Sequence, residues 1–379
     1  MKKSNCFCYR QNTVEVNVDD FASNFKTIRK MLSKNTKIMP ILKNNAYGHG
    51  ALVLAQEAEK LKVTYIGVAC IEEGIQLRQG GIGTSTDILV LGNCFSAAIF
   101  EVAAKNSLTL SIYSADTFKS LKNILKYSSK KISFHLKAEL GMGRIGVDKN
   151  SAYEILREIA NDSRLNMTGM FTHFPVADTD AVSTRNQLNE FMEIVNFARK
   201  KLNLRFLAHC ANSAAILKYK ETHLDMVRPG IALYGILPFS DAEKTLKLKP
   251  ALSWKTRIIQ LKKVYSGISV SYGKVWVARK NSLIATISVG YGDGYSRSLS
   301  NKAKVLVSGK HCPIVGTITM DMSMVDVSDV KDVAVGDEVV LIGKQGNNMI
   351  TAQELAKIQE TISYEIVCSI SSRVPRNFV

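Results

Sequence analysis

The stretch Ile41–Gly50, ILKNNAYGHG, indicates which class of fold this chain adopts. Two apolar residues lead into Lys43, and two asparagines, Tyr47 and a Gly-His-Gly turn follow. An apolar strand that ends in small, polar, turn-forming residues is the place where α/β proteins usually hold their chemistry. Considered alone, Lys43 could simply be a surface lysine. Residues elsewhere in the chain are therefore needed to decide whether Lys43 has a function.

Short apolar runs recur along the first two thirds of the chain, and periodic helical segments such as ALVLAQEAEKL separate them. Eight strands separated by helices predict an α/β fold with an eight-stranded parallel (β/α)8 barrel of the TIM type. A doubly wound open sheet stays open as an alternative, because the sequence does not show strand order. The eight runs are residues 37–42, 65–69, 88–92, 108–113, 132–137, 167–174, 205–210 and 224–235.

The sequence pattern changes near Lys249, where β-rich runs separated by glycine and polar turns begin. One clear helix, TAQELAKIQ, interrupts them near the end. We therefore expect a barrel domain over residues 1–243 and a mainly β domain over residues 244–379. Residues 12–18 are a candidate strand that pairs with the β domain.

Composition excludes several classes of protein. The 379 residues carry a net charge of +17, but the lysines are scattered without a basic block, which favours a solvated surface over nucleic-acid binding. Seven dispersed cysteines without a CxxC pair indicate a reduced, cytoplasmic protein without a metal site. We see no export signal and no apolar run of membrane-spanning length, so no membrane partner is expected.

Polar residues follow several of the predicted strands, at the end where barrels place active sites. The fifth to eighth runs contain or shortly precede His135, Lys137, His173, Ser213 and Arg228. Simpler interpretations exist: His173 as a half-buried histidine, Ser213 as a helix cap and Arg228 as part of a simple turn. Their gathering at one end of successive strands predicts that they converge on a common mouth.

The order of these motifs resembles the alanine racemase family over nearly the whole chain. The matching motifs are ILKNNAYGHG, HLKAELGMGRIGV, GMFTHF, HCANSAA, DMVRPGIALYG, SVSYG, VGYGDGY, TMDM and TISYEI. The resemblance implies a homodimer with shared active sites and pyridoxal 5'-phosphate as the cofactor. It also implies two-base proton transfer on a cofactor aldimine that interconverts L-alanine and D-alanine.

The resemblance also assigns roles to individual residues. Lys43 would form the Schiff base and serve one face of the substrate, and Tyr272 of the second subunit would serve the other. Tyrosine is ordinarily a weak base, with a pKa of about 10, so neighbouring donors would have to favour its anion. The cofactor would contact Lys43, Tyr47, His173, Asn212, Ser213, Arg228, Gly230, Ile231 and Tyr234.

The substrate carboxylate would meet Arg144 and the backbone of Met320, and Tyr291 and Tyr364 would narrow the entrance in favour of alanine. Lys137 aligns with a lysine that is often carbamylated in this family. Glu139 and Leu140 replace the usual Asp and Thr next to it, and Thr317 and Thr319 stand where many members have Arg and Cys.

Several alternatives remain open. The chain could racemise serine or a broader range of amino acids, or it could be a barrel that holds pyridoxal phosphate without racemising. A decarboxylase of similar architecture would be expected to place an acid, and not Arg228, at the ring nitrogen. An alanine racemase would supply D-alanine for peptidoglycan. The N-terminal segment KKSNCFCYR has no physical explanation from the sequence.

Overall fold

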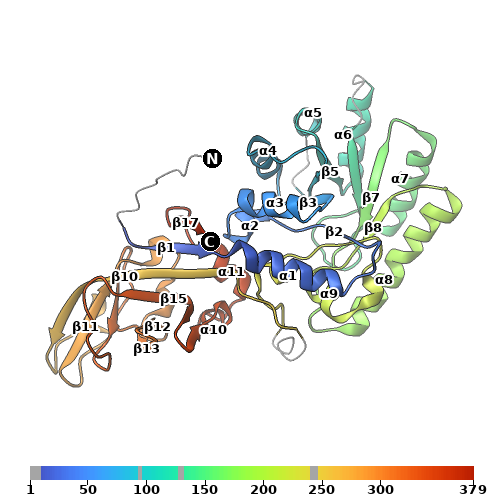
Figure 1. The fold of residues 1–379 in the computed structure, drawn as a ribbon. Coiled ribbons are helices and arrows are strands. Elements are labelled where there is room, and N and C mark those ends of the chain that lie inside the picture. The colour runs from blue at the N-terminus through green and yellow to red at the C-terminus, as the bar shows by residue number, and fades with distance from the viewer. Residues whose placement is uncertain (1–9, 93–95, 127–131, 240–245) are drawn as a thin grey trace. The chain divides into compact units, whose positions relative to one another are not determined.

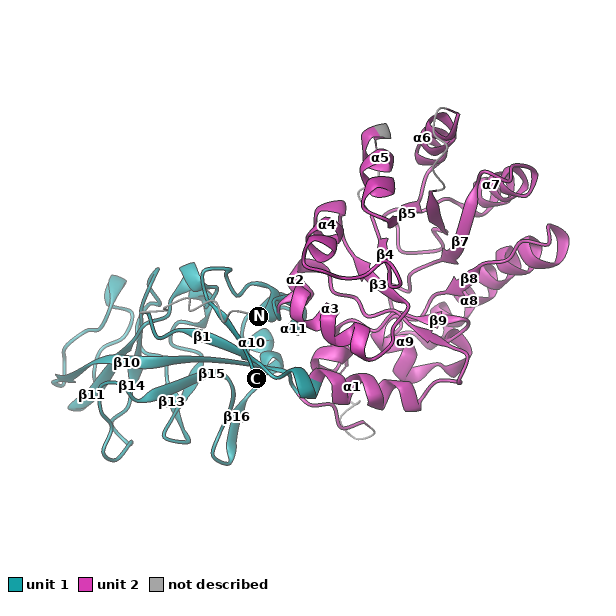
Figure 2. Ribbon diagram, turned by 45° about the horizontal axis from the view of Figure 1, so that its top comes forward, with its two compact units in different colours: residues 1–20, 47–49, 250–379 teal, residues 21–46, 50–249 magenta. Residues whose placement is uncertain are grey.

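The computed structural model describes residues 10–92, 96–126, 132–239 and 246–379. Two compact units divide the chain, and each is described by itself (Figure 2). Unit 1 comprises the described residues up to Asp20, residues 47–49 and residues 250–379, and unit 2 comprises residues 21–46 and 50–249. The division at residues 249/250 falls a few residues after the boundary expected from the sequence.

Parallel strands form the centre of unit 2 (Figure 1). Six of them make one curled sheet in the order β3-β4-β5-β6-β7-β8, and β2 and β9 form a separate parallel pair. All the positions of β3 and β5 are buried, as expected for strands covered on both faces. The bounds are β2 (Lys37–Ile38), β3 (Tyr65–Val68), β4 (Asp87–Val90), β5 (Leu108–Ile112), β6 (Ser133–Lys137), β7 (Asn166–Phe171), β8 (Leu207–His209) and β9 (Met226–Val227).

The sheet therefore differs from the continuous eight-stranded barrel that the sequence predicts. A few backbone contacts lie at both edges. At one edge Ile41, after β2, bridges to Gly67 of β3, whose amide donates to the Pro40 carbonyl at 2.9 Å. At the other edge the Arg228 amide, after β9, donates to the Ala211 carbonyl at 2.9 Å. The pairing of β2 and β9 is only two residues long, because Pro40 and Pro229 follow closely and lack an amide donor.

Helices alternate with these strands along the chain (Figure 1). In α7, residues 152, 155, 156 and 159 are buried, which is the spacing of one helix face. Asn17 caps α1, because its side chain accepts from the Asp20 amide at 2.8 Å. The helices are α1 (Val18–Lys30), α3 (Ala51–Lys60), α4 (Ile71–Gln79), α5 (Ala97–Lys105), α6 (Ala115–Leu125), α7 (Lys149–Asn161), α8 (Ala181–Asn196) and α9 (Ser213–Lys218).

The remaining short helix of this region, α2 (Lys43–Tyr47), is a left-handed turn. Asn44, Asn45, Ala46 and Tyr47 have φ values of 50°, 52°, 54° and 53°. Asparagine tolerates this region, whereas alanine and tyrosine adopt it at a cost, so the surroundings must hold the turn in place. One such contact is the Glu73 carboxylate of α4, which accepts the Asn44 amide at 2.5 Å.

Unit 1 is a mixed sheet of nine strands around the long strand β10, which pairs with β1, β11 and β15. The N-terminal strand β1 also pairs in parallel with the C-terminal strand β17. The sequence predicted one helix here, but a second, α11, follows it. The elements are β1 (Thr13–Val16), β10 (Leu252–Val264), β11 (Ser282–Ile287), β12 (Lys304–Val307), β13 (Lys310–Pro313), β14 (Ser323–Asp326), β15 (Glu338–Gln345), β16 (Asn348–Ile350), α10 (Ala352–Ile358), α11 (Ser363–Cys368) and β17 (Arg376–Phe378).

No helix in the described ranges is both long and apolar enough to span a bilayer.

Candidate functional site

The candidate residues of unit 2 lie at the carboxyl ends of its strands. Lys43 follows the β2 segment, Lys137 ends β6, His173 comes two residues after β7, His209 ends β8, and Arg228 directly follows β9. Parallel strands present their carboxyl ends on the same side of a sheet, so these residues share one end of unit 2.

Arg228 is the most extensively bonded residue of this end, and only 4% of its surface is exposed. Its Nη1 donates to Nδ1 and to the carbonyl of His209, at 3.0 and 2.9 Å. Its Nη2 donates to the carbonyls of Thr172 and Cys210, at 2.7 and 3.0 Å. These acceptors are all neutral, and among the described residues the Nε hydrogen has no acceptor. Burial lowers the pKa of Arg228 to about 10, which leaves a charged guanidinium at neutral pH.

Two buried histidines continue the network away from Arg228. Because a guanidinium only donates, Nδ1 of His209 must accept, and its proton therefore lies on Nε2. That nitrogen lies 2.9 Å from Nδ1 of His135, so His135 accepts in turn. Burial, and then the charge of Arg228, lowers the pKa of His135 to about 3 and the pKa of His209 well below its ordinary value. Both imidazoles are therefore neutral.

His135 was expected at the mouth of the barrel, but it lies inside the sheet. It is fully buried, and its Nε2 has no hydrogen-bond partner in the described part of the chain. Gly169 on the neighbouring strand β7 leaves room for the ring, since a Cβ at Gly169 would come within 2.4 Å of it.

The pKa of His173 reflects the positive charges that surround it. Burial is the largest cause that lowers its pKa well below the ordinary value, and the charges of Arg228, Arg144, Lys137 and Lys43 add to this effect in that order. Four cations thus act on one imidazole. This excess of positive charge suits a ligand that carries anionic groups.

Lys137 is buried, and its Nζ lies 5.7 Å from the centre of the Phe171 ring. Burial, followed by the charges of Arg144 and Arg228, lowers the pKa of Lys137 to about 8, although Glu139 acts in the opposite direction. A substantial share of this amine is consequently unprotonated in mildly alkaline solution.

Glu139 organises the loop that carries Arg144. Its carboxylate accepts from the backbone amides of Gly141, Gly143 and Arg144, at 2.9, 2.8 and 3.2 Å. These bonds hold the pKa of Glu139 below its ordinary value, against the effect of its burial. The Arg144 side chain itself is exposed.

A second group of donors lies between α9 and the turn after β9. The Ser213 hydroxyl is buried and accepts from the amides of Gly230 and Ala232, at 2.9 and 3.3 Å. Ser213 therefore does not cap α9 as its simpler interpretation suggested. Asn212 does so by accepting from the Ala215 amide at 3.0 Å.

Ile231 and Tyr234 belong to the same turn and are fully buried. The Tyr234 hydroxyl donates to the carbonyl of Ile41, two residues before Lys43, at 2.7 Å. Its contact with a phosphate group stays a prediction.

Three candidate residues of unit 1 are exposed: Tyr272, Met320 and Tyr291, by 73%, 55% and 43%. The turn that carries Tyr272 is strained, because Ser271 before it has a φ of 70°. The Thr317 hydroxyl donates to the Tyr272 carbonyl at 3.0 Å and helps to hold this turn. No local pattern in the sequence indicates that contact.

Tyr47 and Tyr364 also come together in unit 1. Their ring centres lie 6.0 Å apart with a tilt of 57°. The backbone is tight here, because a Cβ at Gly48 would lie 2.4 Å from the Val367 carbonyl oxygen. The roles that the resemblance assigns, Tyr47 at the cofactor phosphate and Tyr364 at the entrance, stay predictions, and the structure makes the two residues neighbours.

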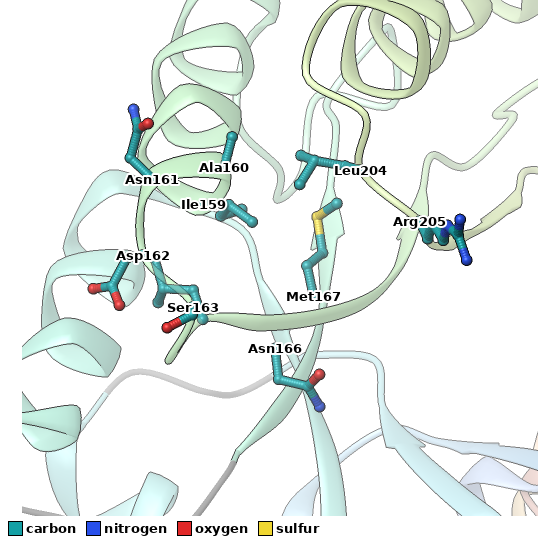
Figure 3. A pocket seen from close by; sticks show the side chains of 10 residues that line it. Ile159, Ala160, Asn161, Asp162, Ser163, Asn166, Met167, Leu204 and Arg205 are labelled. Carbon is teal, nitrogen blue, oxygen red and sulfur yellow. The ribbon is translucent and has the colours of Figure 1, made fainter.

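A pocket of unit 2 lies away from these groups (Figure 3). Asn166 begins β7, and Leu204 and Arg205 precede β8, so the pocket lies at the amino ends of these strands. The candidate residues lie at the carboxyl ends, and the pocket is therefore a separate feature.

Comparisons with known proteins cover both units. The family model of the alanine racemase N-terminal domain matches residues 16–238, and the model of the C-terminal domain matches residues 251–378. Alanine racemase 1 of Caldanaerobacter subterraneus subsp. tengcongensis is 41% identical over 97% of this chain and 94% of its own length. The alanine racemase of Halothermothrix orenii is 41% identical over 97% of each chain.

Solved structures agree with these matches. The alanine racemase of Bacillus anthracis, determined with bound L-Ala-P, superposes with a TM-score of 0.91 and is 34% identical over 98% of this chain and 95% of its own. An alanine racemase of Clostridium difficile gives a TM-score of 0.90 at 37% identity, with 97% and 96% of the two chains covered.

Proposed function

The chain belongs to the alanine racemase family and is an isomerase that interconverts L-alanine and D-alanine, and we propose the residues and the cofactor with which it does so. The observation that carries the proposal is Arg228, a buried cation whose Nη groups are held by neutral acceptors while its Nε hydrogen has no acceptor among the described residues. Such a donor fits the ring nitrogen of pyridoxal 5'-phosphate.

The cofactor is held by residues at the carboxyl ends of the strands. Ser213, Gly230 and Ile231 bind its phosphate, and Tyr47, Asn212 and Tyr234 complete that end, while His173 packs on the ring. The Ser213 hydroxyl accepts from the amides of Gly230 and Ala232 and so lies beside the turn of Gly230 and Ile231, which supports this assignment. The four cations around His173 support it as well, because they suit a phosphate and a substrate carboxylate.

Racemisation requires that a proton leaves one face of Cα and returns to the other. Nζ of Lys43 exchanges the proton on one face, and the phenol oxygen of Tyr272 of the partner subunit exchanges it on the other. Pyridoxal phosphate, when bound, supplies an electron sink for the pair of electrons left at Cα. Arg144 and the Met320 amide orient the substrate carboxylate.

Arg228 moderates this chemistry through its charge. A guanidinium donates a hydrogen bond and does not give up its proton, so the ring nitrogen beside it stays unprotonated. With the cofactor bound, Arg228 would therefore keep the electron sink weak, which would favour return of the proton to the substrate over transamination.

A homodimer completes the site in this proposal. Support comes from the exposure of Tyr272, Met320 and Tyr291, three residues that the proposal assigns to an active site but that lie open on unit 1. We further propose that β2 and β9 close the six-stranded sheet into an eight-stranded barrel, which the backbone contacts at both edges support.

The substrate range and the cellular role are also proposals. Tyr291 and Tyr364 restrict the entrance in favour of alanine, with serine as a slower substrate. The protein acts in the cytoplasm and supplies D-alanine for peptidoglycan.

Incubation of the purified protein with pyridoxal phosphate and L-alanine in D₂O tests this function. We expect loss of optical rotation together with incorporation of deuterium at Cα. Exchange at Cα without loss of rotation would point to a barrel that binds the cofactor without racemising. Faster racemisation of serine than of alanine would favour the broader enzyme.

A further inference from the structure

Two neighbouring turns of unit 1 carry the residues that are assigned above to the substrate entrance. The first turn, residues 290–293, carries Tyr291, and the second, residues 319–322, carries Met320. The Tyr291 amide donates to the Thr319 carbonyl at 3.0 Å, and the Gly292 amide donates to the Met320 carbonyl at 2.9 Å. We call residues 290–293 and 319–322 the paired turns, because these hydrogen bonds couple the position of one turn to that of the other.

Asp293 is the last residue of the first turn, and its carboxylate is fully buried. It accepts from the Gly290 amide at 3.0 Å, which closes the first turn. Arg10 approaches it with both terminal nitrogens, at 2.7 and 2.6 Å, and Nε of Arg373 donates to it at 2.8 Å. A buried carboxylate needs such partners, because an unpaired charge in the interior is strongly destabilising.

Both arginines also reach the second turn. Nη2 of Arg10 donates to the Asp321 carbonyl at 3.0 Å, and Nη2 of Arg373 donates to the Asp321 carboxylate at 2.8 Å. Each guanidinium therefore spans the two turns, and its planar fork fixes their separation more firmly than a flexible amine would.

We propose that Arg10 is a positioning residue for the substrate entrance, which it sets by holding the turn of Tyr291 against the turn of Met320. This inference rests on the proposed function, because it assigns those two residues to the active site of the partner subunit. It gives a physical role to the last residue of KKSNCFCYR, a segment that the sequence alone left unexplained.

Hydrogen exchange of the holoenzyme tests the structural half of the inference without using activity. Arg10→Ala should accelerate exchange of the amides of the paired turns, with little change in the rest of unit 1, and Arg10→Lys should have an intermediate effect. Arg257→Ala is the matched control, because Arg257 binds Gln11 of the same N-terminal segment and the Gly336 carbonyl, yet its contacts lie outside the paired turns. Equal exchange in the Arg10→Ala and Arg257→Ala proteins would overturn the inference.

Kinetics test the functional half. Loss of charge-assisted hydrogen bonds at the entrance should raise KM for alanine by roughly tenfold with kcat nearly unchanged, and the rate ratio of serine to alanine should rise. Arg10→Lys should recover part of the KM. A fall in kcat alone, or faster exchange over all of unit 1, would show a general effect on stability and would refute the positioning role. If the wild-type protein did not racemise alanine, the proposed function would fail, while the exchange experiment would still decide whether Arg10 holds the turns.

Discussion

Nη1 of Arg228 lies 3.0 Å from Nδ1 of His209, and this contact makes the imidazole an acceptor in a network whose hydrogen bonds all run away from the guanidinium. Nε2 of His209 in turn donates a hydrogen bond to Nδ1 of His135. The two histidines therefore hold Arg228 in place without adding charge.

Replacement of His209 by leucine removes the acceptor and leaves a buried hydrogen of Arg228 unpaired. We expect the free energy of unfolding to fall by about 2 kcal/mol and binding of pyridoxal phosphate to the apoprotein to weaken. His209→Asn retains an oxygen acceptor and should behave more like the wild type. Chemical denaturation and an absorbance titration with the cofactor measure the two effects. Equal behaviour of the two variants would contradict the role of the acceptor.

The same histidines predict how stability depends on pH. Their pKa values in the folded protein lie far below the value of about 6.5 in an unfolded chain. The unfolded state therefore binds more protons below that pH, and stability is lost as the pH falls. The two groups together contribute a slope of up to about 3 kcal/mol per pH unit. Urea unfolding between pH 7.5 and 5 should show that His135→Asn removes about half of this slope; an unchanged slope would argue against a neutral, buried His135.

Lys137 is expected to react with carbon dioxide, because its pKa of about 8 leaves unprotonated amine in mildly alkaline solution. The amine nitrogen forms a bond to the carbon of CO₂ and releases a proton to solvent, and the resulting carbamate is an anion beside Arg144. Carbon-13 NMR with labelled bicarbonate should show a carbamate signal that grows as the pH rises through 8 and that Lys137→Ala removes. A spectrum without that signal would mean that Lys137 remains a free amine.

Thr317 is expected to support the strained turn of Tyr272. Thr317→Val removes the hydroxyl that binds the Tyr272 carbonyl while it keeps the shape of the side chain. We expect kcat for alanine to fall roughly fivefold, as for the loss of one hydrogen bond, and Thr317→Ser to restore it. Steady-state kinetics in both directions measure the effect. If serine did not restore the rate, packing and not the hydroxyl would be responsible.

Much of the fold could be predicted from local patterns. Each of the eight apolar runs overlaps one parallel strand, and the change in sequence pattern near Lys249 lies next to Pro250, where the chain returns to unit 1. The polar residues at the strand ends were also visible, because their positions depend only on where strands stop. Both features depend on residues that are close together in the sequence.

Features that depend on distant contacts could not be predicted. The left-handed turn at Asn44–Tyr47 includes Ala46 and Tyr47, which have no local preference for it. His135 looked like a residue of the mouth, and only Gly169 on the next strand reveals why its ring fits inside the sheet. Arg10 and Asp293 lie 283 positions apart, so the sequence held no sign of their pairing.

The most direct test of the account uses two inactive variants in one cell. Lys43→Ala and Tyr272→Phe proteins, each carrying its own affinity tag, should be nearly inactive when produced alone. If each active site combines Lys43 of one subunit with Tyr272 of the other, co-expression should restore about a quarter of wild-type activity, since half of the dimers are mixed and each has one intact site of two. Mixed dimers, isolated through both tags, that remain inactive would contradict the shared site.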